Sequence, residues 1–502
     1  MKKPNIIFIL VDDLGWAEPG CYGNSFNETP NIDNLAESGV CFTQAYASAT
    51  VCSPSRAGLL TGQAPPRNGI TDYLRPWSDW FLPLNSGPHD FADNELPEDT
   101  NFRMDTQLIT MAQMFRKCGY ATGIIGKWHL SGYDKDGVKY GPSNYGFDEV
   151  LLSEQRGIGS GSYFHPYKKV DPTIKPKLGK NEYLVDRMNY EAVEYIKRHK
   201  DEPFFLYLSH YAVHTTLDAK KEDIEYFSKK RETLEKKTKK DEKEKEKKKK
   251  TKRTRKYLKF FITLIDLLNP LKIRSFAKNK KKWTEENNPV LAAMIKSIDD
   301  GVGEIVEILK ELDLYETTMI VFTSDNGGDP WVTQNAHLSA GKSFTYEGGL
   351  RVPQIISYPK IMNSNVTTDI PTINLDFYPT FADIIGYDIP EDYELDGTSL
   401  LPLLKGERDT SSFSGRLLSW HYPLKRRHFL GGRSSAANRK DKYKYIWFFN
   451  EGISELYNLE QDESESINLA DKLPEKAKEH RTSMREWLKE VGGKIPKRQE
   501  GP

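Results

Sequence analysis

The sequence predicts a large α/β domain with a doubly wound sheet, followed by a small C-terminal α+β subdomain. Its 502 residues exceed the ~100–200 residues of one ordinary domain. Short continuous apolar runs alternate along the chain with stretches whose apolar residues recur at helical spacing. Continuous runs are typical of strands buried on both faces, and their alternation with helices is typical of doubly wound folds.

The elements of the main domain, residues 1–410, can be placed in order. The apolar runs that predict strands are residues 6–11, 121–125, 204–208 and 319–322. The stretches that predict helices between them are residues 106–118 and 291–312. Residues 218–288 interrupt the pattern with a lysine-rich stretch and an apolar segment at 257–268, so we interpret them as an insertion.

The C-terminal subdomain is expected to span residues 411–502. Its expected elements are an edge strand at residues 442–449, where basic and aromatic residues alternate, and an amphipathic helix at residues 471–491.

The formal charges of the chain balance, with 72 basic and 72 acidic residues, but they are not evenly distributed. Residues 236–256 carry 14 basic and 4 acidic residues, a net charge of +10, so the rest of the chain carries −10. Three interpretations of the insertion stay open: a solvated loop, which we favour, an element that steers polyanions, and interfacial membrane contact. We do not expect membrane contact through residues 257–268, and we expect no nucleic-acid partner.

The four cysteines are too few for a disulfide framework and form no CxxC pair for a zinc ribbon. No apolar run reaches the ~18–20 residues of a membrane span. The run at residues 6–11 is too short for a signal peptide and lacks a cleavage site. As written, the chain is expected in the cytoplasm, and a trimmed leader would place it in the periplasm or outside the cell.

Side chains that can bind a metal ion or transfer a proton follow all four predicted strands. In strand order they are Asp12 and Asp13, Lys127 and His129, His210 and His214, and Asp325 and Asn326. The carboxyl ends of strands in open α/β sheets face the ligand site. Taken alone, each acidic pair fits a helix cap or a solvated turn as well as it fits a metal site. Because both pairs lie at strand ends, we favour a Ca²⁺ or Mg²⁺ site with oxygen ligands.

Cys52 is followed by Pro54, which is tolerated in the first turn of a helix. The Cys52 side chain is therefore expected at a helix N-terminus, a position that favours anions, with the positive charge of Arg56 one turn along. Two alternatives stay open: a buried structural cysteine, and a low-pKa thiolate nucleophile with a histidine partner. The residues alone indicate a metal-assisted hydrolase of an anionic ester.

The segment Cys52-Ser53-Pro54-Ser55-Arg56, with the Thr61-Gly62 that follows, resembles the signature of type I, formylglycine-dependent sulfatases. Further similar segments occur in the family's order over most of the chain: residues 12–16, 29–33, 126–130, 213–215, 324–327, 341–342, 347–349, 396–400 and 455–459. The resemblance implies an alkaline-phosphatase-like fold with a mixed sheet.

The resemblance also implies that Cys52 is oxidised to formylglycine by a formylglycine-generating enzyme or an anaerobic sulfatase-maturing enzyme. One oxygen of the hydrated aldehyde would attack sulfur, and the second hydroxyl would later expel the sulfate. The implied ligands of a single Ca²⁺ ion are Asp12, Asp13, Asp325, Asn326 and residue 52.

The remaining roles are carried over from the same resemblance. Arg56 would steady the nucleophile, and Lys127 and Lys342 would bind sulfate oxygens. His129 would be the base that breaks down the adduct, and His214 the proton donor to the leaving alcohol. Relatives usually have proline after the threonine that follows His214, which this chain lacks, so His210 remains a competitor for its role.

The expected substrate is a sulfate ester on a carbohydrate or polysaccharide. The aromatic residues considered for stacking on sugar rings, or for ordinary packing, are Trp77, Trp80, Phe81 and Tyr163. Two alternatives stay open: a phosphate or phosphonate monoester hydrolase of the same superfamily, and an unmodified, inactive homologue that binds polyanions.

Overall fold

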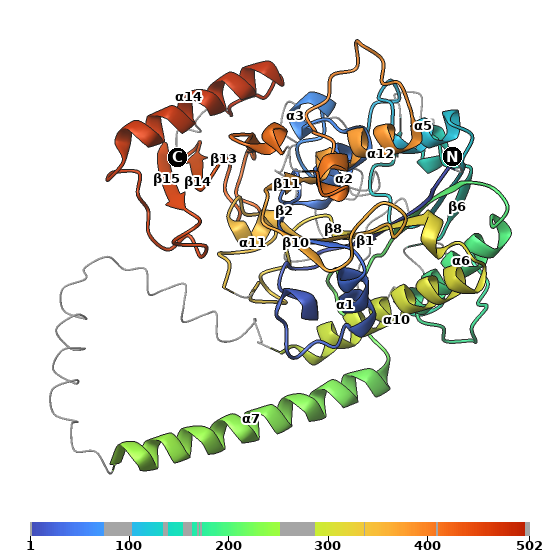
Figure 1. The fold of residues 1–502 in the computed structure, drawn as a ribbon. Coiled ribbons are helices and arrows are strands. Elements are labelled where there is room, and N and C mark those ends of the chain that lie inside the picture. Colours follow the sequence, from blue (N-terminus) through green and yellow to red (C-terminus); the bar gives the residue numbers. More distant parts are fainter. Residues whose placement is uncertain are drawn as a thin grey trace, which may run out of the picture.

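The large sheet of the main domain is mixed, and helices cover both of its faces (Figure 1). The computed structural model describes residues 3–74, 103–133, 139–153, 163–167, 170, 173–250, 287–335, 337–407 and 410–496. In spatial order its strands are β10 (Val366–Thr368), β2 (Val40–Tyr46), β9 (Arg351–Ser357), β8 (Thr318–Ser324), β1 (Asn5–Val11), β7 (Phe204–Ser209), β3 (Ala121–Gly126) and β6 (Glu149–Leu151), with β11 (Thr372–Ile373) also paired to β2.

The four predicted strands are confirmed as β1, β3, β7 and β8, and they lie side by side in the order β8-β1-β7-β3. All of these pairs are parallel, so their carboxyl ends meet at one edge of the sheet. The sequence analysis missed β2 and β9. β9 is antiparallel to both of its neighbours, and the polar residues within β2 and β9 break the continuous apolar pattern of the central strands.

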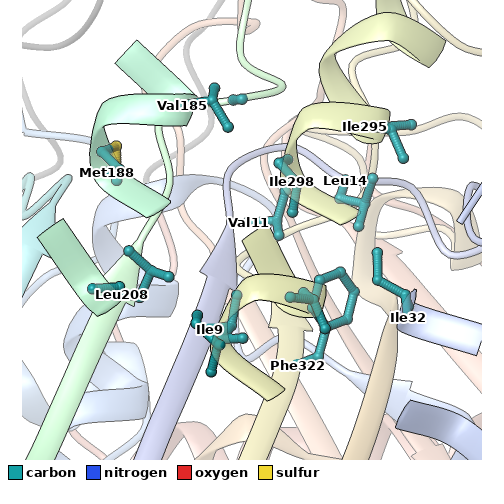
Figure 2. Close-up of a cluster of buried hydrophobic side chains, with 14 of the residues drawn as sticks. Ile9, Val11, Leu14, Ile32, Val185, Met188, Leu208, Ile295, Ile298 and Phe322 are labelled. Carbon is teal, nitrogen blue, oxygen red and sulfur yellow. The ribbon is translucent and has the colours of Figure 1, made fainter. Parts of the chain in front are cut away.

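Helices α1 (Pro30–Glu37), α6 (Leu184–Arg198) and α10 (Pro289–Glu311) lie on one face of the sheet, and α2 (Cys52–Thr61), α5 (Met111–Lys117) and α12 (Phe377–Ile385) lie on the other (Figure 1). Figure 2 shows Ile9 and Phe322 from the strands packed beneath Ile298 of α10. The remaining short elements are α3 (Pro65–Asn68), α11 (Glu347–Leu350), α13 (Leu401–Leu404), β4 (Gly132–Tyr133) and β5 (Lys139–Tyr140).

The helix predicted at residues 106–118 begins five residues later, at Met111. Thr110 caps it, because its side chain accepts a hydrogen bond from the Gln113 backbone and the Gln113 side chain accepts one from the Thr110 backbone. The helix predicted at 291–312 is α10, where the Asn288 side chain caps the first turn.

The first half of the insertion is helical. Helix α7 (Lys221–Lys250) follows β7 and extends away from the body of the domain (Figure 1). Its first turns are anchored, since Phe227 is buried against Phe26 and Lys230 Nζ lies 2.7 Å from Glu28 Oε1. Residues 221–250 therefore form a helix and not a loop, while residues 232–238 are solvent-exposed as the solvated interpretation expects. The apolar segment 257–268 lies outside the described residues.

Within the described ranges, no helix is both long and apolar enough to cross a membrane.

The C-terminal subdomain contains an antiparallel sheet packed against a terminal helix. Its elements are β12 (Leu417–Tyr422), β13 (Ser435–Lys440), β14 (Tyr443–Phe448), β15 (Ile453–Asn458) and α14 (Pro474–Glu490), the last of which confirms the amphipathic helix. The edge-strand prediction for residues 442–449 is wrong, because β14 is paired on both sides.

The basic residue that suggested an edge strand is buried. Lys444 is 0% exposed, and its Nζ lies 2.8 Å from Glu347 Oε1 and 2.9 Å from Glu465 Oε1. Both partners are distant in the sequence, so the alternating pattern could not show that the charge is neutralised inside the protein. Because Glu347 belongs to α11, this ion cluster also joins the two domains.

Replacing Lys444 by methionine is expected to destabilise the protein by about 3–5 kcal/mol, because Glu347 and Glu465 would be left buried without their cation. The midpoint of denaturant or thermal unfolding measures the loss. Lys442→Met is the matched control: this lysine is half exposed and only 3.8 Å from Glu460, so its loss should cost less than about 0.5 kcal/mol. Equal effects of the two changes would contradict the structure.

Candidate active site

The carboxyl ends of the four central strands bring the predicted site residues together. β1 leads into Asp12 and β8 into Asp325, and the Asp325 backbone N–H donates to Val11 O at 3.3 Å. β3 leads into Lys127, whose backbone N–H donates to Ser209 O at 2.8 Å. The loop after β7 is tied to β1 by two backbone hydrogen bonds between Asp12 and residues 212 and 213. The parallel pairing thus continues past the strands and positions the site.

Three carboxylates lie side by side at this edge with almost no solvent contact. Ligand atoms of Asp12, Asp13, Asp325 and Cys52 all lie within 4.8 Å of one another, and all four residues are buried. Asn326 donates from Nδ2 to Asp13 Oδ1 at 2.7 Å, and its Oδ1 is buried without a hydrogen-bond partner. Three carboxylates and an orphaned amide oxygen form a donor set that fits Ca²⁺.

Each carboxylate is also paired with its own cation. Lys127 Nζ lies 2.6 Å from Asp12 Oδ2, and Lys342 Nζ lies 2.8 Å from Asp13 Oδ1. Arg56 is paired with Asp325: Asp325 Oδ2 lies 2.8 Å from Arg56 Nε and 2.7 Å from Arg56 Nη2. Three predicted anion-binding residues and three predicted metal ligands therefore form one charge-balanced cluster.

The pKa values of the acidic residues follow from these pairs. Burial raises the pKa of Asp12 to about 7, and Asp325 and Asp13 add to this, against Lys127 and Arg56. Burial acts in the same direction on Asp13, but Lys342, His214 and Lys127 together outweigh it and hold the pKa of Asp13 well below its usual range. Burial would also raise the pKa of Asp325, but Arg56 and Lys127 together lower it. Asp12 is therefore the carboxylate that most needs an additional cation.

Cys52 is the first residue of α2, as predicted, and its Sγ lies 3.5 Å from Asp12 Oδ1. Burial raises the pKa of the thiol to about 12, although Lys127 and Lys342 act to lower it. The raised pKa disfavours the low-pKa thiolate alternative, because a thiol in this environment is protonated at neutral pH.

The His129 side chain presents an unpaired nitrogen inside the protein. Its Nε2 lies 2.9 Å from Leu74 O, so Nε2–H donates there and the buried Nδ1 is left as an acceptor without a partner. Burial, followed by Lys127 and Arg56, lowers the pKa of His129 well below its usual value. Ser53, which the sequence analysis did not single out, donates to His129 O at 2.9 Å and so ties this loop to α2.

His214 lies at the acidic cluster. Its Nδ1 is 2.6 Å from Thr215 O and its Nε2 is 3.8 Å from Asp13 Oδ2, so Nδ1–H donates to the carbonyl and Nε2 faces the site. Burial, with Lys342, lowers the pKa of His214 to about 3. His214 also falls within 4.8 Å of ligand atoms of Asp12 and Cys52. In the described part of the chain, no such contact joins His210 to the cluster.

Tyr163 is packed inside the protein, so ordinary packing is the alternative that holds for this ring. It is 1% exposed, and its hydroxyl donates to Tyr211 O and His214 O, both at 2.9 Å. Its role is to hold the His214 loop. The other aromatic candidates, Trp77, Trp80 and Phe81, lie outside the described residues.

The profile of the sulfatase family matches residues 4–387. The chain belongs to the sulfatase family. A second profile, of the C-terminal region of N-sulphoglucosamine sulphohydrolase, matches residues 337–493. The protein is thus a sulfuric ester hydrolase, and the predicted fold of the alkaline phosphatase superfamily is confirmed.

Similar proteins cover nearly the whole chain. Human steryl-sulfatase is 30% identical over 488 residues, which cover 82% of this chain and 71% of the relative. A sulfatase of Formosa agariphila is 28% identical over 97% of this chain and 89% of its own length. Among solved structures, Ps i-CgsB is 28% identical with a TM-score of 0.71, covering 97% of this chain and 93% of that one.

Ca²⁺ is expected to bind at the acidic cluster, and its affinity should fall as the pH is lowered from about 8 to about 6. Because the pKa of Asp12 is raised to about 7, protons compete with the cation below that pH, by up to about tenfold in affinity per pH unit. Isothermal titration calorimetry with CaCl₂ measures this. In Asp12→Asn, Ca²⁺ should bind more weakly and this pH dependence should disappear. An affinity of the wild type that is unchanged with pH would contradict the assignment.

Proposed function

We propose that the protein hydrolyses sulfate esters of a sulfated carbohydrate or polysaccharide, with formylglycine at position 52 and one Ca²⁺ ion. The observation that carries this proposal is residue 52 at the start of α2, within 4.8 Å of three buried carboxylates that are themselves paired with Lys127, Arg56 and Lys342. Such a cluster offers both a cation site and fixed positive charges for one sulfate group.

The carbohydrate part of the proposal draws on the relatives. Ps i-CgsB has been solved in complex with k-i-k-neocarrahexaose and is 28% identical to this chain. Human N-acetylgalactosamine-6-sulfatase is 27% identical over 80% of this chain.

The ligand set for the cation would be Asp12, Asp13, Asp325, Asn326 and residue 52, of which the buried Asn326 Oδ1 is the donor now without a partner. Bound there, Ca²⁺ would supply a positive charge that withdraws electron density from sulfate oxygens. Lys127 and Lys342 would then hold sulfate oxygens, because their carboxylate partners share their charge with the cation. Arg56 stays on Asp325 and also donates from Nη1 to Ser209 Oγ at 2.6 Å, so it would fix the base of the site.

Formylglycine would supply a nucleophilic oxygen together with a second hydroxyl on the same carbon. His129 would accept a proton at Nδ1, the nitrogen that Leu74 leaves available. His214 would donate a proton to the leaving alcohol from Nε2, since its Nδ1–H is committed to Thr215 O. The pKa of His214 is low in the free site, and an anionic sulfate bound beside it favours its protonated form.

Cys52→Ala is expected to lower turnover of 4-nitrophenyl sulfate by at least about 10³-fold while leaving the thermal unfolding midpoint nearly unchanged. Cys118→Ala, a cysteine outside the site, is the control and should keep full activity. Peptide mass analysis of active wild-type protein should show an aldehyde at position 52. A persistent thiol in active protein, or activity that survives Cys52→Ala, would refute the role of residue 52.

The substrate class is tested with a panel of sulfated mono- and hexasaccharides from carrageenan, chondroitin sulfate and heparin, alongside 4-nitrophenyl sulfate and 4-nitrophenyl phosphate. We expect desulfation of at least one saccharide, and a kcat/KM for the aryl sulfate well above that for the aryl phosphate. Faster turnover of the phosphate would favour a phosphate monoester hydrolase instead. Turnover of the aryl sulfate without release of sulfate from any saccharide would reject the carbohydrate part of the proposal.

A further inference from the structure

Two large aromatic side chains from distant parts of the chain meet on the surface. Trp331 and Phe429 are each 50% exposed, and their ring centroids lie 5.8 Å apart at an angle of 63°. Trp331 follows β8, and Phe429 lies between β12 and β13 of the C-terminal subdomain. Aromatic rings stabilise a protein most when they are fully buried. A pair of contacting rings that stays half exposed therefore indicates a surface that a ligand covers.

Contacts with the catalytic loops position Trp331. Its backbone N–H donates to Asp329 Oδ1 at 2.8 Å, and Asp329 Oδ2 accepts a hydrogen bond from Thr215 Oγ1 at 3.4 Å. Thr215 is the residue that holds the His214 ring. At the start of the same loop, Gly328 O accepts a hydrogen bond from Lys342 N at 2.9 Å. The Trp331 loop is therefore connected to both the proposed proton donor and a proposed sulfate ligand.

The Phe429 loop belongs to the C-terminal subdomain and packs against the same region. His428 and Gly432 close a tight turn, in which His428 N donates to Gly432 O at 2.9 Å. A Cβ atom added to Gly432 would lie 1.9 Å from Ser343 O, so only glycine permits this approach to the residue that follows Lys342. The loop thus brings Phe429 to the border of the site.

The same loop carries aromatic and positive groups on either side of Phe429. The His428 ring contacts the Phe429 ring at 4.3 Å and the Tyr73 ring at 5.7 Å, and Tyr73 precedes the Leu74 that holds His129. Arg426 and Arg427 are exposed immediately before His428; Arg427 has 60% of its side chain in solvent, and its Nη2 lies 3.5 Å from Glu451 Oε1. Aromatic faces beside guanidinium groups are suited to a ligand with apolar C–H faces and anionic substituents.

We propose that Trp331 and Phe429 form a sugar-binding subsite for the saccharide ring next to the one that carries the scissile sulfate, with Arg426 and Arg427 near an anionic group of that ring. The inference rests on the proposed function, because it extends the carbohydrate substrate beyond the residue that reacts. A protein partner is disfavoured, since two rings are far smaller than the ~800 Å² per partner of a stable protein interface.

The subsite predicts a selective loss with longer substrates. The probe pair is 4-nitrophenyl sulfate, which has no second ring to fill the subsite, and the sulfated hexasaccharide that the panel shows to be turned over fastest. We expect Trp331→Ala and Phe429→Ala each to lower the ratio of hexasaccharide kcat/KM to aryl sulfate kcat/KM by about tenfold, mainly through KM of the hexasaccharide. Trp331→Tyr keeps an aromatic face and should restore most of the ratio.

Tyr226→Ala is the matched control, because Tyr226 is an equally exposed aromatic residue on α7, where it contacts Glu28 rather than the catalytic loops. It should leave the ratio at the wild-type value. A ratio within about twofold of wild type in both alanine variants would overturn the subsite and leave the proposed function intact. Aryl sulfate turnover with no hexasaccharide desulfated by the wild type would overturn both.

Discussion

Three carboxylates buried side by side at the end of a parallel sheet are the constraint on which the rest of the site depends. Isolated charges in such a place would be strongly unfavourable, so each of Asp12, Asp13 and Asp325 requires compensation by positive charge. The compensation comes from separate segments of the chain: Lys127 after β3, Arg56 in α2 and Lys342 before α11. The same ion pairs hold the side chains of Lys127, Arg56 and Lys342 in place for an anionic substrate. The raised pKa of Asp12 indicates that its negative charge is incompletely compensated, so a further cation would be stabilised there.

This constraint also explains why the C-terminal subdomain is closely attached to the main domain. Lys342 lies between β8 and α11, where the described residues form no helix or strand. The subdomain holds both ends of it, since Ser339 Oγ donates to Ser464 O at 2.7 Å and Glu347 N donates to Glu465 Oε2 at 2.7 Å. Lys444 neutralises Glu347 and Glu465 together. The buried ion cluster and these hydrogen bonds therefore hold the residues that flank the Lys342 segment.

Much of the site could be predicted because its residues directly follow strands that contain a continuous apolar run. All seven residues of β1 and of β8 are buried, so these strands are recognisable without any knowledge of their neighbours. The place of Tyr163 stayed open for the opposite reason. Whether an aromatic ring stacks on a ligand or supports a loop depends on its hydroxyl partners, Tyr211 O and His214 O, which belong to another segment.

The sequence by itself determined the central parallel strands, the placement of the metal-ligand candidates at their ends and the helix that begins at Cys52, because these features rest on local periodicity and on neighbours in the chain. Only the tertiary structure decided which cation meets which carboxylate, that Lys444 is buried rather than at an edge, and that Trp331 and Phe429 meet beside the site. Each of these depends on contacts between residues that belong to different elements and are not neighbours in the sequence. Burial and pairing of charge are properties of the folded chain, and no local pattern records them.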